Sequence, residues 1–266
     1  MRARALALTL SLCLPLAGCR RKHVPVARAT ELPYPTCPAG PLPAGEVLTE
    51  RTLRAAPNAL EPDVVERFSV TRRDCLTVFT ARQDWHMNVS EIEVVYDARG
   101  IPLRAWKRMT IPGARNGEGA ADTRRYELRT PEVVITRAAP NHPRGFELLR
   151  GGVPSAVIGP GRGLLTMWIQ RARLQVGQRV RETVLDMREL VEKIRPVTLR
   201  REPDMTHPEI GRRVRVYTVY GRETVFTDEN DVVIGDLGGM RPADRVPGPA
   251  PAPLPVPSPP DPVHTP

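Results

Sequence analysis

Several acidic residues and one histidine have a spacing that could support proton transfer. Asp84 and His86 flank a tryptophan, so they share one face if the segment is extended, where a carboxylate and an imidazole could act together. Four further carboxylates could supply an acid and base pair: Glu182, Asp186, Glu189 and Glu192. Charges at these spacings are also typical of a solvated face. No serine stands in a Gly-x-Ser-x-Gly motif, and we assign no catalytic residue from the sequence.

A glycine-rich run precedes a predicted helix. Gly159, Gly161 and Gly163 alternate with other residues, and free N–H groups at a helix N-terminus can hold a phosphate. However, Pro160 removes one donor, and no Lys-Ser or Lys-Thr pair follows. A flexible connection between a strand and a helix explains the same glycines.

The run DENDVVIGD, residues 228–236, clusters oxygen donors that could bind calcium. Val232 and Val233 stand where an EF-type loop needs an oxygen donor and its glycine, so a hairpin turn is the better interpretation. Apart from His86, the histidines are not spaced like metal ligands; they are His23, His142, His207 and His264. We therefore expect neither a metal site nor a cofactor.

A cysteine follows a short apolar run near the start of the chain. Two arginines precede about a dozen apolar residues, too few to span a bilayer, which is the pattern of an export signal. The run ends in Leu16-Ala17-Gly18-Cys19, which resembles the lipobox of bacterial lipoproteins. An ordinary secretory signal with an incidental cysteine is the alternative.

The lipobox resemblance implies a lipid anchor and a location. Leu16, Ala17 and Gly18 would be the recognised cleavage residues, and Cys19 would carry diacylglycerol as the new N-terminus. The basic residues after Cys19 favour contact with anionic headgroups. No acidic residue stands directly after the cysteine, which implies the bacterial outer membrane, with the domain facing the periplasm.

Charge and cysteine content restrict the partners further. The formal net charge is +9, which suits an anionic membrane surface or polyanionic envelope polymers. Nucleic acid is not expected as a partner, because the arginines are dispersed and the chain is exported. Cys37 and Cys75 remain for a disulfide in an oxidising compartment, although two reduced thiols fit the sequence equally well.

Composition divides the chain into four parts. Residues 1–18 form the signal peptide, and residues 19–45 form a proline-rich tether. Residues 46–240 form one β-rich domain, and residues 241–266 form a disordered proline-rich tail.

The pattern of the domain is mostly of period two, with one helix. Short strands separated by a few turn residues predict an antiparallel meander in the first two thirds, and a further antiparallel set follows the helix. The spacing of apolar residues predicts the helix over 163–173. In the later strand RRVRVYTVYG, Val214 and Val216 are predicted to face inward and Arg213 and Arg215 outward.

This layout resembles the half-barrel of periplasmic lipoprotein-carrier proteins and their envelope relatives. The fold class is therefore predicted as mainly β, a strongly curved antiparallel sheet with one central helix. In that family the helix closes an apolar cavity for acyl chains. The resemblance implies that such a cavity would be lined by Leu164, Leu165, Met167, Trp168 and Ile169. A solid core filled by the same residues is the alternative.

Three functions remain open from the sequence. The first is a non-catalytic, membrane-anchored binding protein that holds an apolar ligand or an envelope protein. The second is a scaffold or assembly component that recruits partners through sheet edges or its tail. The third is a hydrolase acting on envelope polymers. A long cavity would favour an apolar ligand, and a solid core with an uncovered edge strand would favour the scaffold.

Overall fold

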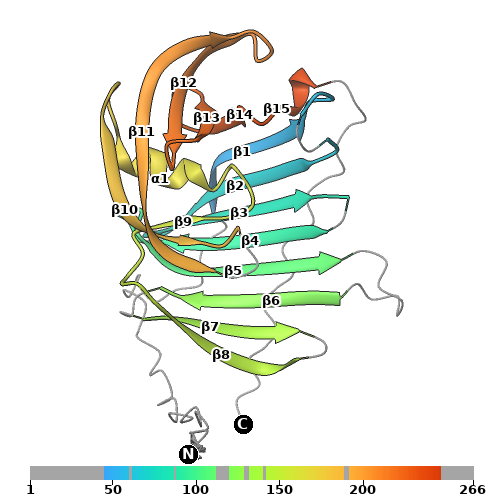
Figure 1. Cartoon of the computed structure of the whole chain (residues 1–266), viewed down its shortest axis with the longest axis vertical. Helices are drawn as coiled ribbons and strands as arrows, with labels where there is room; N and C mark the ends of the chain where they lie inside the picture. Colours follow the sequence, from blue (N-terminus) through green and yellow to red (C-terminus); the bar gives the residue numbers. More distant parts are fainter. Residues whose placement is uncertain are drawn as a thin grey trace, which may run out of the picture. The chain divides into compact units, whose positions relative to one another are not determined.

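The structure is a computed structural model, and it describes residues 45–59, 62–86, 88–111, 120–128, 132–139, 142–188 and 192–246. These residues form two β-sheets and one α-helix, the mainly β half-barrel predicted from the sequence (Figure 1). Among them no helix is long and apolar enough to cross a membrane. The lipobox residues 16–19, Cys37 and the proline-rich segments lie outside the described residues.

Sheet A contains nine strands in the order β15-β1-β2-β3-β4-β5-β6-β7-β8, and each pair of neighbours is antiparallel. The meander predicted for the first two thirds of the domain is thereby confirmed. The strands are β1 (Glu46–Ala55), β2 (Val65–Arg73), β3 (Leu76–Asp84), β4 (Val89–Tyr96), β5 (Pro102–Ile111), β6 (Ala120–Glu127), β7 (Glu132–Ala139), β8 (His142–Arg150) and β15 (Met240–Pro242).

Sheet B contains six strands in the order β14-β13-β12-β11-β10-β9. They are β9 (Ala156–Ile158), β10 (Arg179–Asp186), β11 (Lys193–His207), β12 (Arg212–Val219), β13 (Glu223–Thr227) and β14 (Val233–Asp236). The set β10 to β14 is antiparallel, as predicted, whereas β9 and β10 are parallel. A parallel pair needs a crossover, which here contains the helix. β15 and the short helix η1 (Ala243–Arg245) extend the ordered domain to residue 245, whereas the sequence analysis ended it at residue 240 and placed residues 241–266 in a disordered tail.

Helix α1 (Leu165–Ala172) confirms the predicted helix, with a start two residues later. It ends at Arg173, which has a left-handed backbone with φ of 48° and donates its N–H to the carbonyl of Ile169. In Figure 1 α1 lies inside the curve formed by the two sheets. Its apolar face joins the main core, where Trp168 is buried together with side chains of both sheets, among them Phe68 and Tyr217.

The facing predicted for β12 is confirmed in part. Val214 and Val216 are buried, in a second small cluster with Phe226, and the Arg213 side chain is 78% exposed. Tyr217 and Val219, on the opposite face of β12, contribute to the main core. The face of β12 that carries Arg213 is therefore exposed near the start of the strand and buried at Tyr217 and Val219.

The packing of the glycine run generates a prediction for stability. A Cβ atom at Gly163 would collide with the ring of Phe68, which has no exposed surface. We expect Gly163→Ala to lower the free energy of unfolding by about 3 kcal/mol, because a rigid buried ring must move. Gly177→Ala is the control: it meets no atom within 4 Å, and its φ of +83° should cost only about 1 kcal/mol. Equal losses in urea unfolding would contradict this account of the packing.

Candidate functional site

The glycine run is occupied by a carboxylate of the chain itself. Glu66 on β2 accepts the N–H groups of Arg162 and Gly163 at 2.7 and 2.6 Å. Burial raises the pKa of Glu66, and these two hydrogen bonds offset part of that shift. A Cβ at Gly161 would lie 2.8 Å from a Glu66 oxygen, so the glycines permit close packing. The N–H groups that could have held a phosphate are therefore already bonded.

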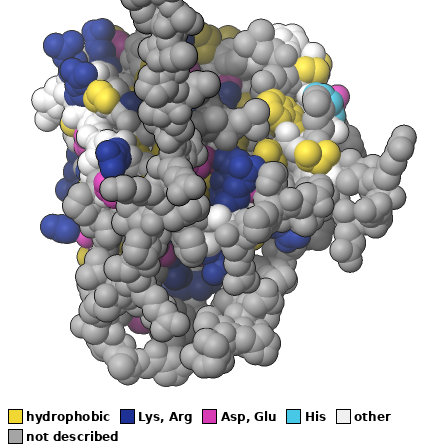
Figure 2. Space-filling model, turned by 60° about the horizontal axis from the view of Figure 1, so that its bottom comes forward, with side chains coloured by type: hydrophobic (Ala, Val, Ile, Leu, Met, Phe, Trp, Pro, Cys, Tyr) yellow, Lys and Arg dark blue, Asp and Glu magenta, His cyan; other side chains and the backbone are white. Residues whose placement is uncertain are grey.

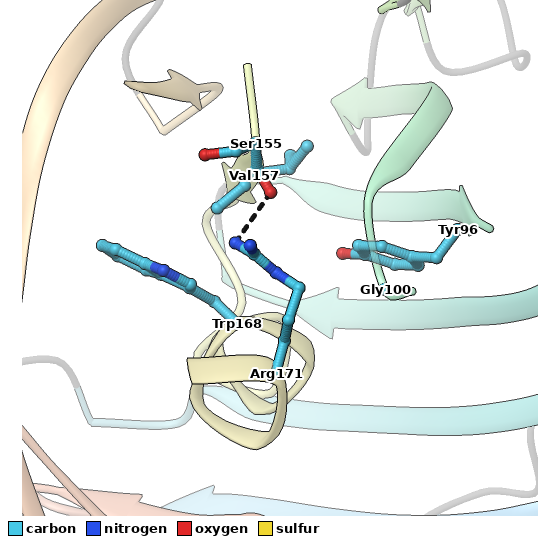
Figure 3. A pocket seen from close by; sticks show the side chains of 7 residues that line it. Tyr96, Gly100, Ser155, Val157, Trp168 and Arg171 are labelled. Atoms are coloured by element: carbon cyan, nitrogen blue, oxygen red, sulfur yellow. Dashed lines mark hydrogen bonds between the residues drawn. The ribbon is translucent and has the colours of Figure 1, made fainter. Parts of the chain in front are cut away.

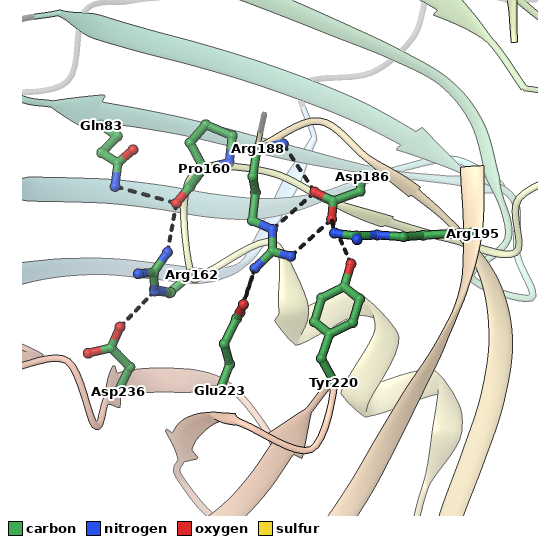
Figure 4. A network of polar contacts seen from close by, with 9 residues as sticks. All are labelled: Gln83, Pro160, Arg162, Asp186, Arg188, Arg195, Tyr220, Glu223 and Asp236. Carbon is green, nitrogen blue, oxygen red and sulfur yellow. Dashed lines mark hydrogen bonds and ion pairs between the residues drawn. The ribbon is translucent and has the colours of Figure 1, made fainter. Parts of the chain in front are cut away.

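The same loop is tied to both sheets by polar contacts. The Nε of Arg162 lies 2.6 Å from the Asp236 carboxylate on β14. The carbonyl of Pro160 accepts hydrogen bonds from Arg162 at 3.1 Å and from Gln83 of β3 at 3.5 Å (Figure 4). Sheet A, the loop and sheet B are thus joined by one chain of contacts.

A second polar cluster surrounds Asp186 at the end of β10. Its carboxylate accepts hydrogen bonds from Arg188 at 2.9 Å, from Arg195 at 2.5 Å and from Tyr220 at 2.6 Å (Figure 4). Burial alone would raise the pKa of Asp186, but these donors hold it well below its usual range. Both guanidinium groups lie over the Tyr220 ring, at 4.9 and 4.7 Å from its centroid. Asp186 is therefore an ion-pair partner with no free oxygen evident for proton transfer.

Further carboxylates named as acid and base candidates are also paired. Glu192 is bonded to Arg124 and, at 2.8 Å, to the Tyr126 hydroxyl, while Glu182 pairs with Arg171. Asp84 contacts Arg82 at 2.7 Å and Arg67 at 3.4 Å, and His86 is exposed. Glu189 lies outside the described residues. The structure does not bring the described members of this group together as a pair of carboxylates.

Lys107 lies next to the Glu192 cluster and was not singled out from the sequence. Its Nζ donates to the Met187 carbonyl at 2.6 Å, and burial lowers its pKa. The only sequence signal for Lys107 and Glu66 is that each is a charged residue in a strand whose neighbouring side chains on the same face are apolar.

The five residues predicted to line a cavity belong to the main core. Leu164, Leu165, Met167, Trp168 and Ile169 are all buried within it. A shallow pocket beside α1, partly open to solvent, includes Trp168 and Arg171, and it has no enclosed space that would hold a water molecule (Figure 3). Across it Arg171 donates to the Ser155 carbonyl at 2.9 Å, while the Trp168 Nε1 is buried without a hydrogen-bond partner. Ligand pockets for drug-sized molecules usually measure about 300 to 1,000 Å³.

The sequence also contains residues considered for a metal site and for a disulfide. Within the described ranges no three His, Cys, Asp or Glu side chains are grouped so as to hold a metal ion. Asp228 accepts the N–H groups of Asn230 and Val232 at 3.0 Å each, which forms the predicted hairpin turn. Cys75 is disulfide-bonded, and Cys37, its predicted partner, lies outside the described residues.

The far edge of sheet A is an open backbone surface in the described part of the chain. β8 pairs with β7 on one side and has no strand on its other side. Leu149 packs against the main core, whereas Leu148 on the opposite face is 46% exposed. The unpaired main-chain groups of an edge strand can accept a strand from another chain.

Basic side chains are dispersed over the surface. Lys and Arg side chains visible on the face drawn in Figure 2 form several separate patches.

Comparisons with known proteins give distant similarities of fold. No family model matches the sequence, and no curated protein matches it. A DUF1089 family protein from Pseudomonas aeruginosa is 13% identical with a TM-score of 0.45, and the alignment covers 66% of this chain and 91% of that protein. A β-barrel-like protein of domain of unknown function DUF1849 from Brucella abortus is 13% identical with a TM-score of 0.40, over 76% of this chain and 94% of that one. Neither description gives an activity.

Removal of the Glu66 carboxylate tests the importance of the loop contact. We expect Glu66→Ala to lower the free energy of unfolding by about 3 to 5 kcal/mol, because two buried N–H groups lose their acceptor and a cavity remains. Glu66→Gln keeps one acceptor oxygen and should cost about 1 to 3 kcal/mol. The control Glu91→Ala removes a half-exposed pair with Arg82 and should cost under about 1 kcal/mol. A Glu66→Ala loss no larger than the control, in urea unfolding, would contradict this role.

Proposed function

We propose that this chain is a lipoprotein of the bacterial envelope whose β domain binds a protein partner without catalysing a reaction. The Leu16-Ala17-Gly18-Cys19 run supports the lipid anchor, with diacylglycerol on Cys19. The proposed location is the outer membrane, with the domain facing the periplasm. The proline-rich segment after Cys19 would then set how far the domain reaches from the membrane.

The open edge of β8 is the observation that carries protein binding. An extended segment of a partner could pair with this edge, gain main-chain hydrogen bonds, and place side chains on both faces of sheet A. Leu148, exposed on one of these faces, offers an apolar contact to an added strand. This is the scaffold alternative of the sequence analysis, reached through the geometry of the sheet.

An apolar ligand has less support than a protein partner. Helix α1 and side chains of both sheets fill the core, and the pocket beside α1 has no enclosed space that would hold a water molecule. A hydrolase also has less support, because the described candidate carboxylates have basic partners. We therefore propose strand addition at β8 in preference to both.

Lipidation of Cys19 is tested by the mass of the mature protein. We expect the mature protein purified from bacterial membranes to begin at Cys19 and to carry the mass of a diacylglycerol group with or without a further acyl chain. Cys19→Ser should lose this mass. Cys75→Ser is the matched control and should retain the lipid. Wild-type protein without lipid mass, or a Cys19→Ser variant that still carries it, would contradict the proposed anchor.

Strand addition at β8 is tested by site-specific photo-crosslinking in the intact envelope. A photoreactive phenylalanine analogue replaces Leu148, or replaces Met205 on β11 as a control of similar exposure, 46% against 42%. We expect a discrete protein adduct from position 148 that is absent from position 205. No adduct at 148, or the same adduct from both positions, would contradict binding at this edge. Because this readout does not depend on lipid mass, the anchor and the binding surface are tested separately.

A further inference from the structure

The outer face of the hairpin formed by β10 and β11 carries exposed arginines. Side chains alternate between the faces of a strand, and Glu182 and Val184 of β10 point inward, to Arg171 of α1 and to the main core. Arg179 and Arg181 therefore point outward, and both are exposed. In Figure 1 β10 stands at the left edge of the domain, with α1 on its inner side.

The register places two positive charges directly opposite each other on this face. Arg179 pairs with Arg200 of β11, which is also exposed. Directly opposite residues of an antiparallel pair have Cβ atoms about 4.5 to 5.5 Å apart, and like charges at these positions destabilise a sheet. An anion that binds both guanidinium groups would remove this repulsion.

Acidic side chains of the chain itself neutralise these arginines only in part. Arg200 has Glu202 at 3.5 Å, and Glu202 also accepts the Thr218 hydroxyl. Across the residues that the structure describes, Arg179 and Arg181 have no ion pair or side-chain hydrogen bond. We call Arg179, Arg181 and Arg200 the arginine face.

An exposed apolar side chain lies at the same end of the hairpin. Val176, 56% exposed, belongs to the turn that precedes β10. The next residue, Gly177, donates its N–H to the carbonyl of Arg201 at 2.9 Å, which holds the turn beside Arg200. An apolar tip next to basic side chains suits the boundary between lipid headgroups and acyl chains. A soluble polyanion would make no use of Val176.

We propose that the arginine face docks onto the phosphate groups of anionic phospholipids and so fixes which side of the domain faces the membrane. The proposal rests on the proposed place of the chain at a membrane, but it does not require lipid on Cys19. The guanidinium groups bind headgroup phosphates, and Val176 contacts the outermost apolar layer.

The test measures binding of unlipidated protein to vesicles. The full mature chain with Cys19→Ser is mixed with vesicles of phosphatidylglycerol and phosphatidylethanolamine, or of phosphatidylcholine alone, and the bound fraction is measured by sedimentation. We expect binding to the anionic vesicles only, and weaker binding as salt is raised. Arg179→Ser with Arg181→Ser should lower the partition coefficient roughly 25-fold, about fivefold for each arginine.

A matched double variant separates this face from net charge. Arg108→Ser with Arg125→Ser removes the same charge from two exposed positions on strands of sheet A and should change binding less than fivefold. Circular dichroism checks that both variants fold. Equal losses from the two double variants, unchanged binding of the Arg179 and Arg181 variant, or equal binding to neutral vesicles would overturn the proposal. Lipidation of Cys19 is tested by mass and docking of the arginine face by vesicle binding, so the failure of one proposal can be told from the failure of the other.

Discussion

The carboxylate of Glu66 is the constraint on which the interior of the domain depends. It lies on sheet A without exposure and accepts two N–H groups from the loop that leads into α1. A buried carboxylate is costly unless donors surround it, so the loop and the strand stabilise each other. Because Gly163 packs directly on Phe68, the loop also fixes where the helix begins. The helix then lies in the curve of the sheets and fills it.

Because the interior of the domain is filled, a binding site is expected on its outer surface. The charged side chains of the interior are used to join parts of the fold: Arg162 of the loop reaches Asp236 of β14, and Arg188 links Asp186 of β10 to Glu223 of β13 within sheet B. Removal of one member of such a pair leaves an uncompensated charge, which makes these side chains poor candidates for a reaction that changes their protonation. Main-chain groups at the open edge and side chains on the outer faces are free of this restriction.

Sequence periodicity predicted the parts of the fold that local patterns determine. Alternation of apolar and polar residues identified the meander and the antiparallel set, and helical spacing identified α1. The contact of Glu66 with Arg162 joins residues 96 positions apart, so no local pattern could show it. β9 was missed because its three residues are too few for a period. The burial of Tyr217 and Val219, on the face that also carries Arg213, was not predicted because the arginines at the start of β12 suggest a solvent face. The pairing of Glu192 with Arg124 of β6 could not be predicted either, because the two residues are 68 positions apart.

The composition of β8 restricts what can pair with its open edge. When a second strand pairs with β8 in the antiparallel sense, directly opposite residues of the two strands project from the same face of the sheet. Glu147 and Leu148 are exposed on opposite faces, and Arg150 already contacts Glu132 on β7. Self-pairing of two copies centred on Glu147 would oppose two carboxylates, which is unfavourable, and charged edge residues protect natural sheets from such pairing. A heterologous strand that offers a basic residue opposite Glu147 and an apolar residue opposite Leu148 avoids this repulsion, so the edge favours a different protein over a second copy of this chain.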